Sequence, residues 1–313
     1  MKRIDVHLAA SLVFFLFGIS CNSPEKKGYD DTPTSGNVQI LADECHQPLV
    51  DVELDTFMKL YKYAIVRPTY LPEQQVFDKL LHNDTFRVAV VSRELNEQEK
   101  KHFESISYYP RTTKVAVDAL ALILNPANPD TQLTYAEVGE MISGSRIFWK
   151  KEKGQSADSI RIVFDRSGSA NARLLKERFL NEKDFPTNCY ALNSNKEVIE
   201  YVSKTKGAVG VIGVNWISDR HDPEVESFLS TVKIAEISNP EDSTTTTYYG
   251  PYQAYIALKK YPLTRDVYVI SREGRNGLGT GFASFFAGDQ GQRLVRMCGL
   301  LPATMPVRII NIR

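Results

Sequence analysis

The sequence has no surplus of either charge, because 38 lysine and arginine residues balance 38 aspartates and glutamates over 313 residues. Proteins that bind nucleic acids present a strong basic surplus, so we expect no nucleic-acid partner. The sequence also lacks the run of about 20 apolar residues that a membrane-spanning helix needs. With 42% hydrophobic and 24% charged residues, its composition is typical of a globular protein.

Motifs for catalysis and for metal binding are also missing. There is no CxxC pair, GxSxG, HExxH or lysine-bearing phosphate loop, and the histidines are not paired at the spacing of metal ligands. Glu44 and Glu73 have no nucleophile paired with them for acid–base chemistry. We therefore expect that the protein is not an enzyme and that it has no cofactor and no metal site. Cys45, Cys189 and Cys298 are scattered, so we expect buried small side chains, with one disulfide as the alternative.

What the sequence does contain begins at the N-terminus. Two basic residues precede an apolar run of 12 residues, Leu8 to Ile19, which suits the core of a signal peptide over residues 1–20. The run ends in Gly18-Ile19-Ser20-Cys21, which resembles the lipobox of bacterial lipoproteins and implies that Cys21 is lipidated. An aliphatic residue is usual at the position of Gly18, and plain cleavage is the alternative. Residues 21–36 are polar and rich in Pro, Ser and Gly, so we expect a flexible tether.

Beyond the tether, short apolar runs alternate with amphipathic stretches. We expect strands at Val38–Ala42, Ile65–Pro68, Arg87–Ser92, Ile160–Phe164, Ala208–Gly213, Val232–Ile237, Asp266–Ser271 and Arg308–Ile312. Helical periodicity marks most segments between them, and Thr134 with Glu137 has the pattern of a helix capping box. This alternation predicts an α/β architecture with mostly parallel sheets. The glycine-rich stretch Gly277–Gly281 is not a GxGxxG motif, and we expect a flexible loop there.

Several segments resemble the solute-binding proteins of phosphate ABC transporters (PstS-like). They follow the order and spacing of that family: Val117–Pro126, Leu133–Glu137, Ser143-Gly144, Gly207–Gly210, Tyr261–Arg265, Gly291-Gln292 and Cys298–Pro302. The resemblance covers about Val38 to Leu301. It implies a two-lobed type II periplasmic-binding-protein-like fold, in which each lobe is a mostly parallel sheet flanked by helices and two crossover strands join the lobes. Residues 37–124 and 266–313 would form lobe 1, and residues 125–265 lobe 2.

The resemblance also implies a function. Members of the family close their two lobes on a small solute and offer it to a membrane permease. The expected protein is therefore a solute-binding lipoprotein of an ABC-type importer, with phosphate or a similar small oxyanion as ligand. Its expected partners are this solute, an ABC permease and, through the lipid, the membrane. We expect a monomer that is exported and anchored to the cell envelope.

The expected ligand site lies where strand ends meet helix N-termini, because backbone N–H groups there favour anions. Three loops and one helix start qualify. The candidate ligand-binding residues are Asp43, Glu44 and Cys45 in the first loop, Ser92 and Arg93 in the second, Arg166, Ser167, Gly168, Ser169 and Asn171 in the third, and Glu73 at the helix start. Ser169 is expected to cap its helix and to contact the ligand as well.

These loops differ from those of phosphate-binding relatives, which are rich in Gly, Ser and Thr. Asp43, Glu44 and Glu73 put carboxylates where an anion would bind, so a zwitterionic or cationic solute suits the site at least as well as phosphate. Arg93 either holds an oxyanion through a bidentate contact or neutralises Asp43 or Glu44. The acidic residues also favour an alternative function, in which the protein has lost transport and acts as a surface or sensory interaction module.

Overall fold

The computed structural model describes residues 31–149, 158–218, 223–242 and 246–304, and every structural statement below concerns these residues. They lie in one compact unit that begins at Asp31. The expected signal peptide, the expected lipidation site Cys21 and the expected strand Arg308–Ile312 lie outside the described residues. Within the described ranges, no helix is long and apolar enough to cross a membrane.

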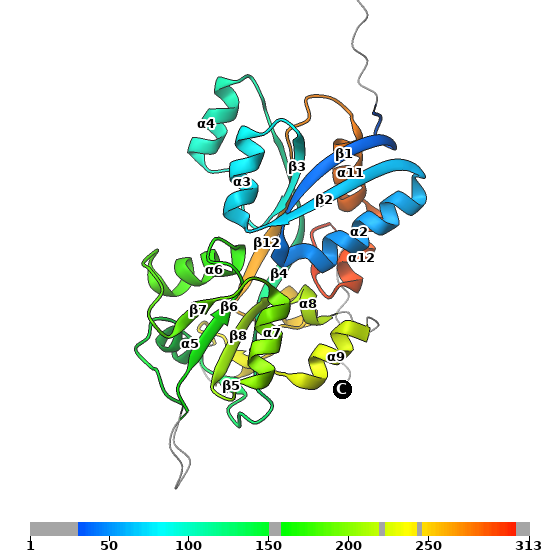
Figure 1. Ribbon diagram of the computed structural model, residues 1–313. Helices are drawn as coiled ribbons and strands as arrows, with labels where there is room; N and C mark the ends of the chain where they lie inside the picture. The colour runs from blue at the N-terminus through cyan, green and yellow to red at the C-terminus, as the bar shows by residue number, and fades with distance from the viewer. Residues whose placement is uncertain (1–30, 150–157, 219–222, 243–245, 305–313) are drawn as a thin grey trace, which may run out of the picture. The chain divides into compact units, whose positions relative to one another are not determined.

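A mixed sheet runs through this unit in the order β2-β1-β3-β12-β4-β8-β6-β7, and β13 and β9 each pair with β4 (Figure 1). We call β2, β1, β3 and β12 the first half of the sheet, and β8, β6 and β7 the second half. A smaller sheet has the order β11-β10-β5. The strands are Ser35–Asp43 (β1), Tyr63–Leu71 (β2), Phe86–Val91 (β3), Arg111–Leu124 (β4), Gln132–Leu133 (β5), Arg161–Phe164 (β6), Cys189–Ala191 (β7), Ala208–Gly213 (β8), Lys233–Ile234 (β9), Glu236–Ser238 (β10), Tyr248–Tyr249 (β11), Thr264–Ser271 (β12) and Leu301–Pro302 (β13).

The long strand β4 belongs to both halves. Its residues up to Ala119 pair with β12, and those from Leu120 onward pair with β8. The pairs of β1 with β2 and β3, and of β6 with β7 and β8, are parallel, whereas β12 and β4 run antiparallel to their neighbours. The antiparallel strands β12 and β4 thus lie between the parallel strands β2, β1 and β3 and the parallel strands β8, β6 and β7, which confirms the expected α/β class with crossover strands.

Helices cover both faces of the first half. Neighbouring residues of a strand point to opposite faces. Ile40 and Ala42 therefore pack with α2, α11 and α12, whereas Leu41 packs with α3 and α4. A separate apolar cluster joins the second half to α5, α6, α7 and α8. The helices are Gln47–Leu60 (α2), Glu73–His82 (α3), Glu97–Ser105 (α4), Tyr135–Ile142 (α5), Ala170–Leu175 (α6), Asn195–Lys204 (α7), Asn215–Ser218 (α8), Pro223–Thr231 (α9), Gln253–Ala257 (α10), Leu278–Ala287 (α11) and Asp289–Met297 (α12), with a 3₁₀ turn at Glu44–His46 (η1) and a π turn at Lys176–Leu180 (η2).

Local sequence signals account for several helix starts. The capping box of α5 forms as expected: the Thr134 hydroxyl accepts from the Glu137 N–H, and the Glu137 carboxylate accepts from the Thr134 N–H. Ser169 caps α6 by accepting from the Ala172 N–H, which confirms its expected N-cap role.

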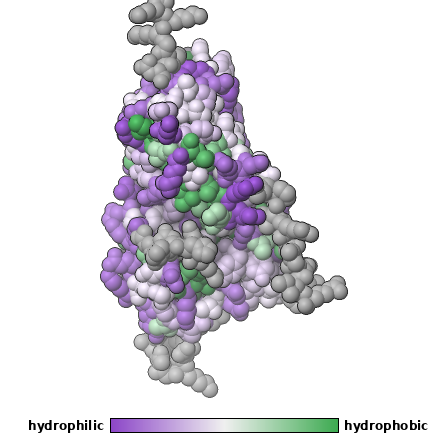
Figure 2. Space-filling view, turned by 90° about the vertical axis from the view of Figure 1, so that its right-hand side faces the viewer, coloured by the Kyte–Doolittle hydropathy of each residue, from purple (hydrophilic) through white to green (hydrophobic). Residues whose placement is uncertain are grey.

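The face in Figure 2 is predominantly hydrophilic, with hydrophobic residues in limited areas.

The expectation of a flexible loop at Gly277–Gly281 is wrong, because α11 begins at Leu278 and includes Gly279 and Gly281. A Cβ atom added at Gly281 would lie 1.9 Å from the carbonyl oxygen of Pro33. Gly281 thus lets the start of α11 pack directly against the backbone of Pro33, which a side chain would prevent.

Two expected boundaries also differ. β1 begins at Ser35, and Asp31 pairs with Arg87 and Arg275, so part of the expected tether belongs to the folded unit. The single strand expected at Val232–Ile237 is instead two short strands, β9 and β10, which join different sheets.

Candidate functional site

Loops that follow β1, β3 and β6 meet beside the crossover strands β4 and β12. Asp43 ends β1 and the 3₁₀ turn η1 follows it, Ser92 follows β3, and the loop Asp165–Ser169 follows β6. Carboxyl ends of parallel strands lie at one edge of a sheet, which is where ligands of open α/β folds bind. Here the loops of the two halves contact one another directly, as the hydrogen bonds below show.

Asp43 is fully buried and connects the two halves. Its Oδ1 accepts a hydrogen bond from the Cys45 N–H at 3.0 Å, and its Oδ2 accepts one from the Ala170 N–H at 2.8 Å. Ala170 is the first residue of α6, directly after the Ser169 cap. The carboxylate of Asp43 therefore lies where the N-terminus of α6 would hold an anion.

Glu44 makes a second connection between the halves. Its Oε1 accepts from the Asn195 N–H at 3.3 Å, and its Oε2 accepts from the Asn195 side-chain amide at 2.7 Å. Asn195 is the first residue of α7 and is fully buried. A second helix start in the second half of the sheet thus also holds a carboxylate from η1.

Glu73 makes the third connection, through the first residue of α3. Its Oε1 accepts from the Ser92 N–H at 2.7 Å, and its Oε2 accepts from Nε of Arg173 at 2.6 Å. Arg173 lies on α6 and also donates to the carboxylate of Glu177 and to the carbonyl oxygen of Ser92. Glu73 therefore accepts hydrogen bonds both from the backbone of Ser92 and from the half-buried guanidinium of Arg173.

A buried ion pair lies beneath these contacts. Arg265 of β12 donates from Nε and Nη2 to Oδ2 of Asp118 on β4, at 3.0 and 2.7 Å, and from Nη1 to Oδ1 of Asn171 at 2.8 Å. The Nε2 atom of His46 lies 2.6 Å from the Ser92 hydroxyl. Burial, with Arg265 and Arg173 nearby, lowers the pKa of His46 well below its ordinary value, so this ring is neutral.

Four backbone N–H groups therefore converge on this region from four different loops, and each holds a carboxylate oxygen of the chain. They belong to Cys45, Ser92, Ala170 and Asn195. Backbone donors at helix starts are the groups that bind small oxyanions. The arrangement has the kind of donors that bind oxyanions, and all four are paired with the protein's own acids.

Burial strongly affects the proton affinity of these acids. It raises the pKa of Asp43 to about 7, and the nearby carboxylate of Glu73 adds to this rise. It also raises the pKa of Glu44. The pKa of Asp165 is raised well above its ordinary value by burial and by the charge of Asp43. Both shifts favour the protonated forms of Asp43 and Asp165.

Arg93 differs from both roles expected for it. Its two terminal nitrogens donate to the two carboxylate oxygens of Glu99, each at 2.7 Å, and its guanidinium lies 3.5 Å from the centre of the Phe77 ring. Glu99 also completes the capping box of α4 with Asn96. Arg93 is therefore paired locally, away from Asp43 and Glu44, and we leave it out of the proposed site.

The other expected residues divide between the centre and the rim. Ser169 and Asn171 are buried at the centre, where Ser169 also donates to Oδ1 of Asp165 at 2.5 Å. Ser167 and Arg166 are exposed at the rim. The Gly168 carbonyl accepts from the Gln74 N–H at 3.0 Å, which adds a further contact between the halves.

Cys45 contributes backbone groups rather than its thiol. Its carbonyl oxygen accepts from the indole N–H of Trp216 at 3.0 Å. Burial raises the pKa of its thiol well above the ordinary value. No disulfide joins Cys45, Cys189 and Cys298 to one another.

Several residues of this region are absent from the set expected from the sequence: His46, Asp118, Asp165, Arg173, Asn195 and Arg265. The signal that could have identified two of them is a charged residue within an apolar strand. Asp118 interrupts the apolar run Val115–Leu124, and Arg265 pairs with it in the register of β4 and β12. Such a residue is retained in a buried strand only with a partner.

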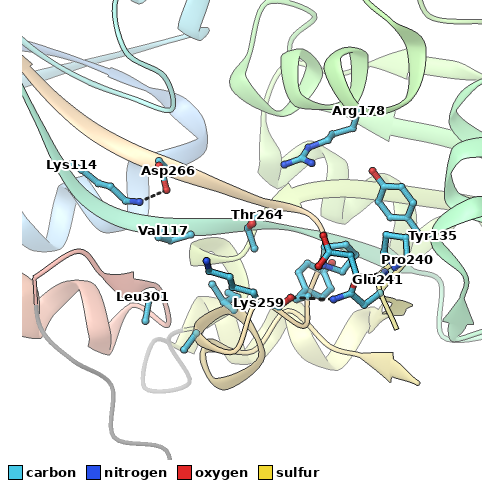
Figure 3. Close-up of a pocket in the computed structure, with 15 residues that line it drawn as sticks. Lys114, Val117, Tyr135, Arg178, Pro240, Glu241, Lys259, Thr264, Asp266 and Leu301 are labelled. Carbon is cyan, nitrogen blue, oxygen red and sulfur yellow. Dashed lines mark hydrogen bonds and ion pairs between the residues drawn. The ribbon is translucent and has the colours of Figure 1, made fainter. Parts of the chain in front are cut away.

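A second candidate is a cavity of about 420 Å³ beside the crossover strands (Figure 3). Val117 of β4 and Thr264 of β12 line it, one residue away from Asp118 and Arg265. Because neighbouring strand residues point to opposite faces, this cavity lies on the other face of the crossover strands from the buried ion pair. None of the expected site residues lines it. We refer to it as the hinge cavity.

Comparison with known proteins identifies the class of protein. The family model described as the PBP superfamily domain matches residues 27–290, so the chain belongs to this superfamily. Similar curated proteins are the phosphate-binding protein PstS of Borreliella burgdorferi, 26% identical over 229 residues, with 71% of this chain and 74% of the relative covered, and that of Pseudomonas aeruginosa strain PAO1, 22% identical with 96% and 95% covered.

Solved structures agree on the fold. A putative phosphate ABC transporter substrate-binding protein of Clostridium perfringens, solved with bound phosphate, has a TM-score of 0.71 at 18% identity, with 86% of this chain and all of that chain covered. An ABC-type phosphate transport receptor of Vibrio cholerae has a TM-score of 0.62 at 20% identity, with 85% and 100% covered. The expected two-lobed periplasmic-binding-protein-like fold is thus confirmed.

Proposed function

We propose that this protein is the solute-binding component of an ABC-type importer, and that it holds phosphate or a similar small oxyanion between its two lobes. The lobes of this proposal are residues 37–124 with 266–313, and residues 125–265. It acts by binding rather than by catalysis. Family membership and relatives named as phosphate-binding proteins support the assignment.

One observation carries the oxyanion assignment. The backbone N–H groups of Cys45, Ser92, Ala170 and Asn195 converge between the two halves and already hold carboxylate oxygens. Carboxylate and phosphate oxygens accept hydrogen bonds from the same kind of donor. Donors from both halves are needed to complete the set, so the ligand would be held only when the halves are close together.

The proposal includes a place in the cell and a set of partners. The protein is exported by its signal peptide and anchored to the cell envelope through lipid on Cys21. It works as a monomer and delivers its solute to an ABC permease. Mass spectrometry of the membrane-extracted protein tests the anchor, since a diacylated N-terminal Cys21 gives a mass that plain cleavage does not.

Calorimetry with inorganic phosphate tests the ligand. Binding to the native state raises the unfolding temperature, because it stabilises that state by RT ln(1 + [L]/Kd). We expect heat on titration and a raised melting temperature at about 1 mM phosphate. If neither is observed, phosphate is not the ligand.

A glycine variant tests whether the ligand lies between the halves. A Cβ atom at Gly168 would already lie 3.0 Å from Oε1 of Gln74 on the opposite half. Gly168→Phe should therefore keep the halves apart and weaken phosphate binding about tenfold or more, because donors of one half are lost. Gly274→Phe is the matched control, since nothing lies within 4 Å of a Cβ there. Equal phosphate affinity of the two variants would contradict binding between the halves.

The acids of the site favour a second candidate ligand class. Asp43, Glu44 and Asp165 lie near the donors, and their raised pKa values favour the protonated acids. The positive group of a zwitterionic or cationic solute would neutralise these carboxylates in place of the protons. A panel of amino acids and polyamines in the same melting assay separates this candidate from phosphate. If the protein is instead a surface or sensory module without transport, neither group of solutes should raise its melting temperature.

A further inference from the structure

The donors of the site are already satisfied without any solute. Asp43 takes the N–H groups of Cys45 and Ala170, and Glu73 takes that of Ser92. The Asp43 carboxylate is fully buried at the first turn of α6. A small oxyanion bound there would make the contacts that Asp43 makes now, so the oxyanion and the Asp43 carboxylate compete for one place.

The same carboxylates also join the two halves. Asp43 contacts Ala170 at 2.8 Å, Glu44 contacts Asn195 at 2.7 Å, and Glu73 contacts Arg173 at 2.6 Å. Each carboxylate comes from an element of the first half, and each partner comes from α6 or α7 beside the second half. In this arrangement the chain's own side chains provide contacts that a bound solute would otherwise supply.

An added anion cannot share the place with an ionised Asp43. The Glu73 carboxylate is near enough to raise the pKa of Asp43 through its charge, and like charges at close range in a buried site repel strongly. The cations nearby are engaged, since Arg265 pairs with Asp118 and Arg173 with Glu73. An incoming oxyanion must therefore displace the Asp43 carboxylate from the Ala170 N–H.

We propose that Asp43 is a resident competitor for the ligand: in the ligand-free protein it occupies the Ala170 N–H and holds the halves closed, and it leaves when an oxyanion binds. This inference rests on the proposed function, because it assumes an oxyanion ligand at these donors. It favours tetrahedral oxyanions such as phosphate over monocarboxylates, because four oxygens reach donors of more loops than the two oxygens of a carboxylate.

Substitution of Asp43 tests the competition. Asp43→Ser removes the carboxylate and frees the donors, so phosphate should bind about tenfold more tightly or better than to the unchanged protein. Asp43→Asn keeps the size and an acceptor oxygen but removes the charge, and should give an intermediate affinity. Isothermal titration with inorganic phosphate measures both, and circular dichroism checks that each variant is folded. Where Asp43→Ser does not fold, Asp43→Asn carries the test.

A proline at position 170 locates the gain in affinity. Ala170 is the first residue of α6, a position that tolerates proline, and Ser169 before it has the extended φ of −75° and ψ of 163° that a following proline requires. Ala170→Pro removes the contested N–H, so the double variant Asp43→Ser/Ala170→Pro should lose the gain of Asp43→Ser. Glu97→Pro in the Asp43→Ser background is the matched control, because Glu97 is the first residue of α4 after the Asn96 cap, and should keep the gain.

Small-angle scattering of the ligand-free proteins separates this inference from the proposed function. We expect the unchanged protein to keep its radius of gyration when phosphate is added, and Asp43→Ser to be larger until phosphate is added. If Asp43→Ser matches the unchanged protein in both size and phosphate affinity, the inference is overturned while phosphate binding by both still supports the proposed function. If Asp43→Ser is larger but neither protein binds phosphate, the closing role of Asp43 stands and phosphate fails as the ligand.

Discussion

Glu53 is an acid buried on an apolar helix face without a hydrogen-bond partner. It lies on α2 between Val50 and Leu54, is fully buried, and neither of its carboxylate oxygens has a partner among the described residues. Burial raises its pKa to about 9. Because the raised pKa means that the folded state favours the proton, its unfavourable effect on stability grows as pH rises from 4.5 to about 9.

Replacement of Glu53 by an uncharged side chain of similar shape should stabilise the protein at high pH. Glu53→Met should raise the free energy of unfolding by an amount on the order of 1 kcal/mol for each pH unit above 4.5, and by least below pH 4.5. Thermal unfolding at pH 5 and pH 8 measures the difference. Asp55→Asn on the exposed face of α2 is the control and should change stability by less than about 0.5 kcal/mol at both pH values. A gain for Glu53→Met that is equal at both pH values would contradict a cause in the buried charge.

At the scale of elements, α11 depends on glycine for its close contact with the start of the described chain. Alanine favours helices over glycine by about 1 kcal/mol, so helix propensity alone predicts that Gly281→Ala stabilises the protein. The Cβ would lie 1.9 Å from the Pro33 carbonyl oxygen, so we expect a loss of about 1–3 kcal/mol instead. Urea denaturation measures the sign. Gly274→Ala, with open space around its Cβ, should be neutral, and a stabilised Gly281→Ala would refute the packing role.

Elements with local signals could be predicted from the sequence. The Thr134–Glu137 capping box and the Ser169 cap need only residues within one helical turn, and both form as expected. The glycines of α11 could not be interpreted locally, because their purpose is set by Pro33 and Val88, which are distant in the sequence. A glycine-rich pattern alone favours a loop, and tertiary packing overrides it here.

For the candidate site, too, the sequence could predict only some of the features. Strand ends and helix starts predicted that Asp43, Glu44, Glu73 and Ser92 lie in one region, as they do, but not what each side chain contacts. Asp43 and Ala170 are 127 residues apart in the sequence, and Asp118 and Arg265 are 147 apart. Such pairs depend on how the two halves pack against each other. The pattern and spacing of residues within one segment carry no information on that packing.

At the scale of the whole described unit, the hinge cavity and the proposed oxyanion site lie on opposite faces of β4 and β12. The cavity is lined from both halves: Lys114 and Asp266 pair at 2.6 Å on the crossover strands, while Tyr135 and Arg178 approach from α5 and η2 (Figure 3). A rotation about the crossover strands that separates the loops of the oxyanion site must bring these opposite walls together. The empty volume of the hinge cavity therefore provides space for opening.

Filling the hinge cavity should oppose opening. Thr264 lines it from β12, so Thr264→Trp places a large ring where the walls would approach each other. In the Asp43→Ser background, which we expect to open, Thr264→Trp should reduce the radius of gyration toward that of the unchanged protein, and phosphate should dissociate more slowly in stopped-flow exchange. Thr264→Ser is the matched control, because it keeps the hydroxyl and leaves the cavity free. If the tryptophan and serine variants open equally and release phosphate at one rate, the two halves do not move about β4 and β12, and the closing role assigned to Asp43 would need a different axis of motion.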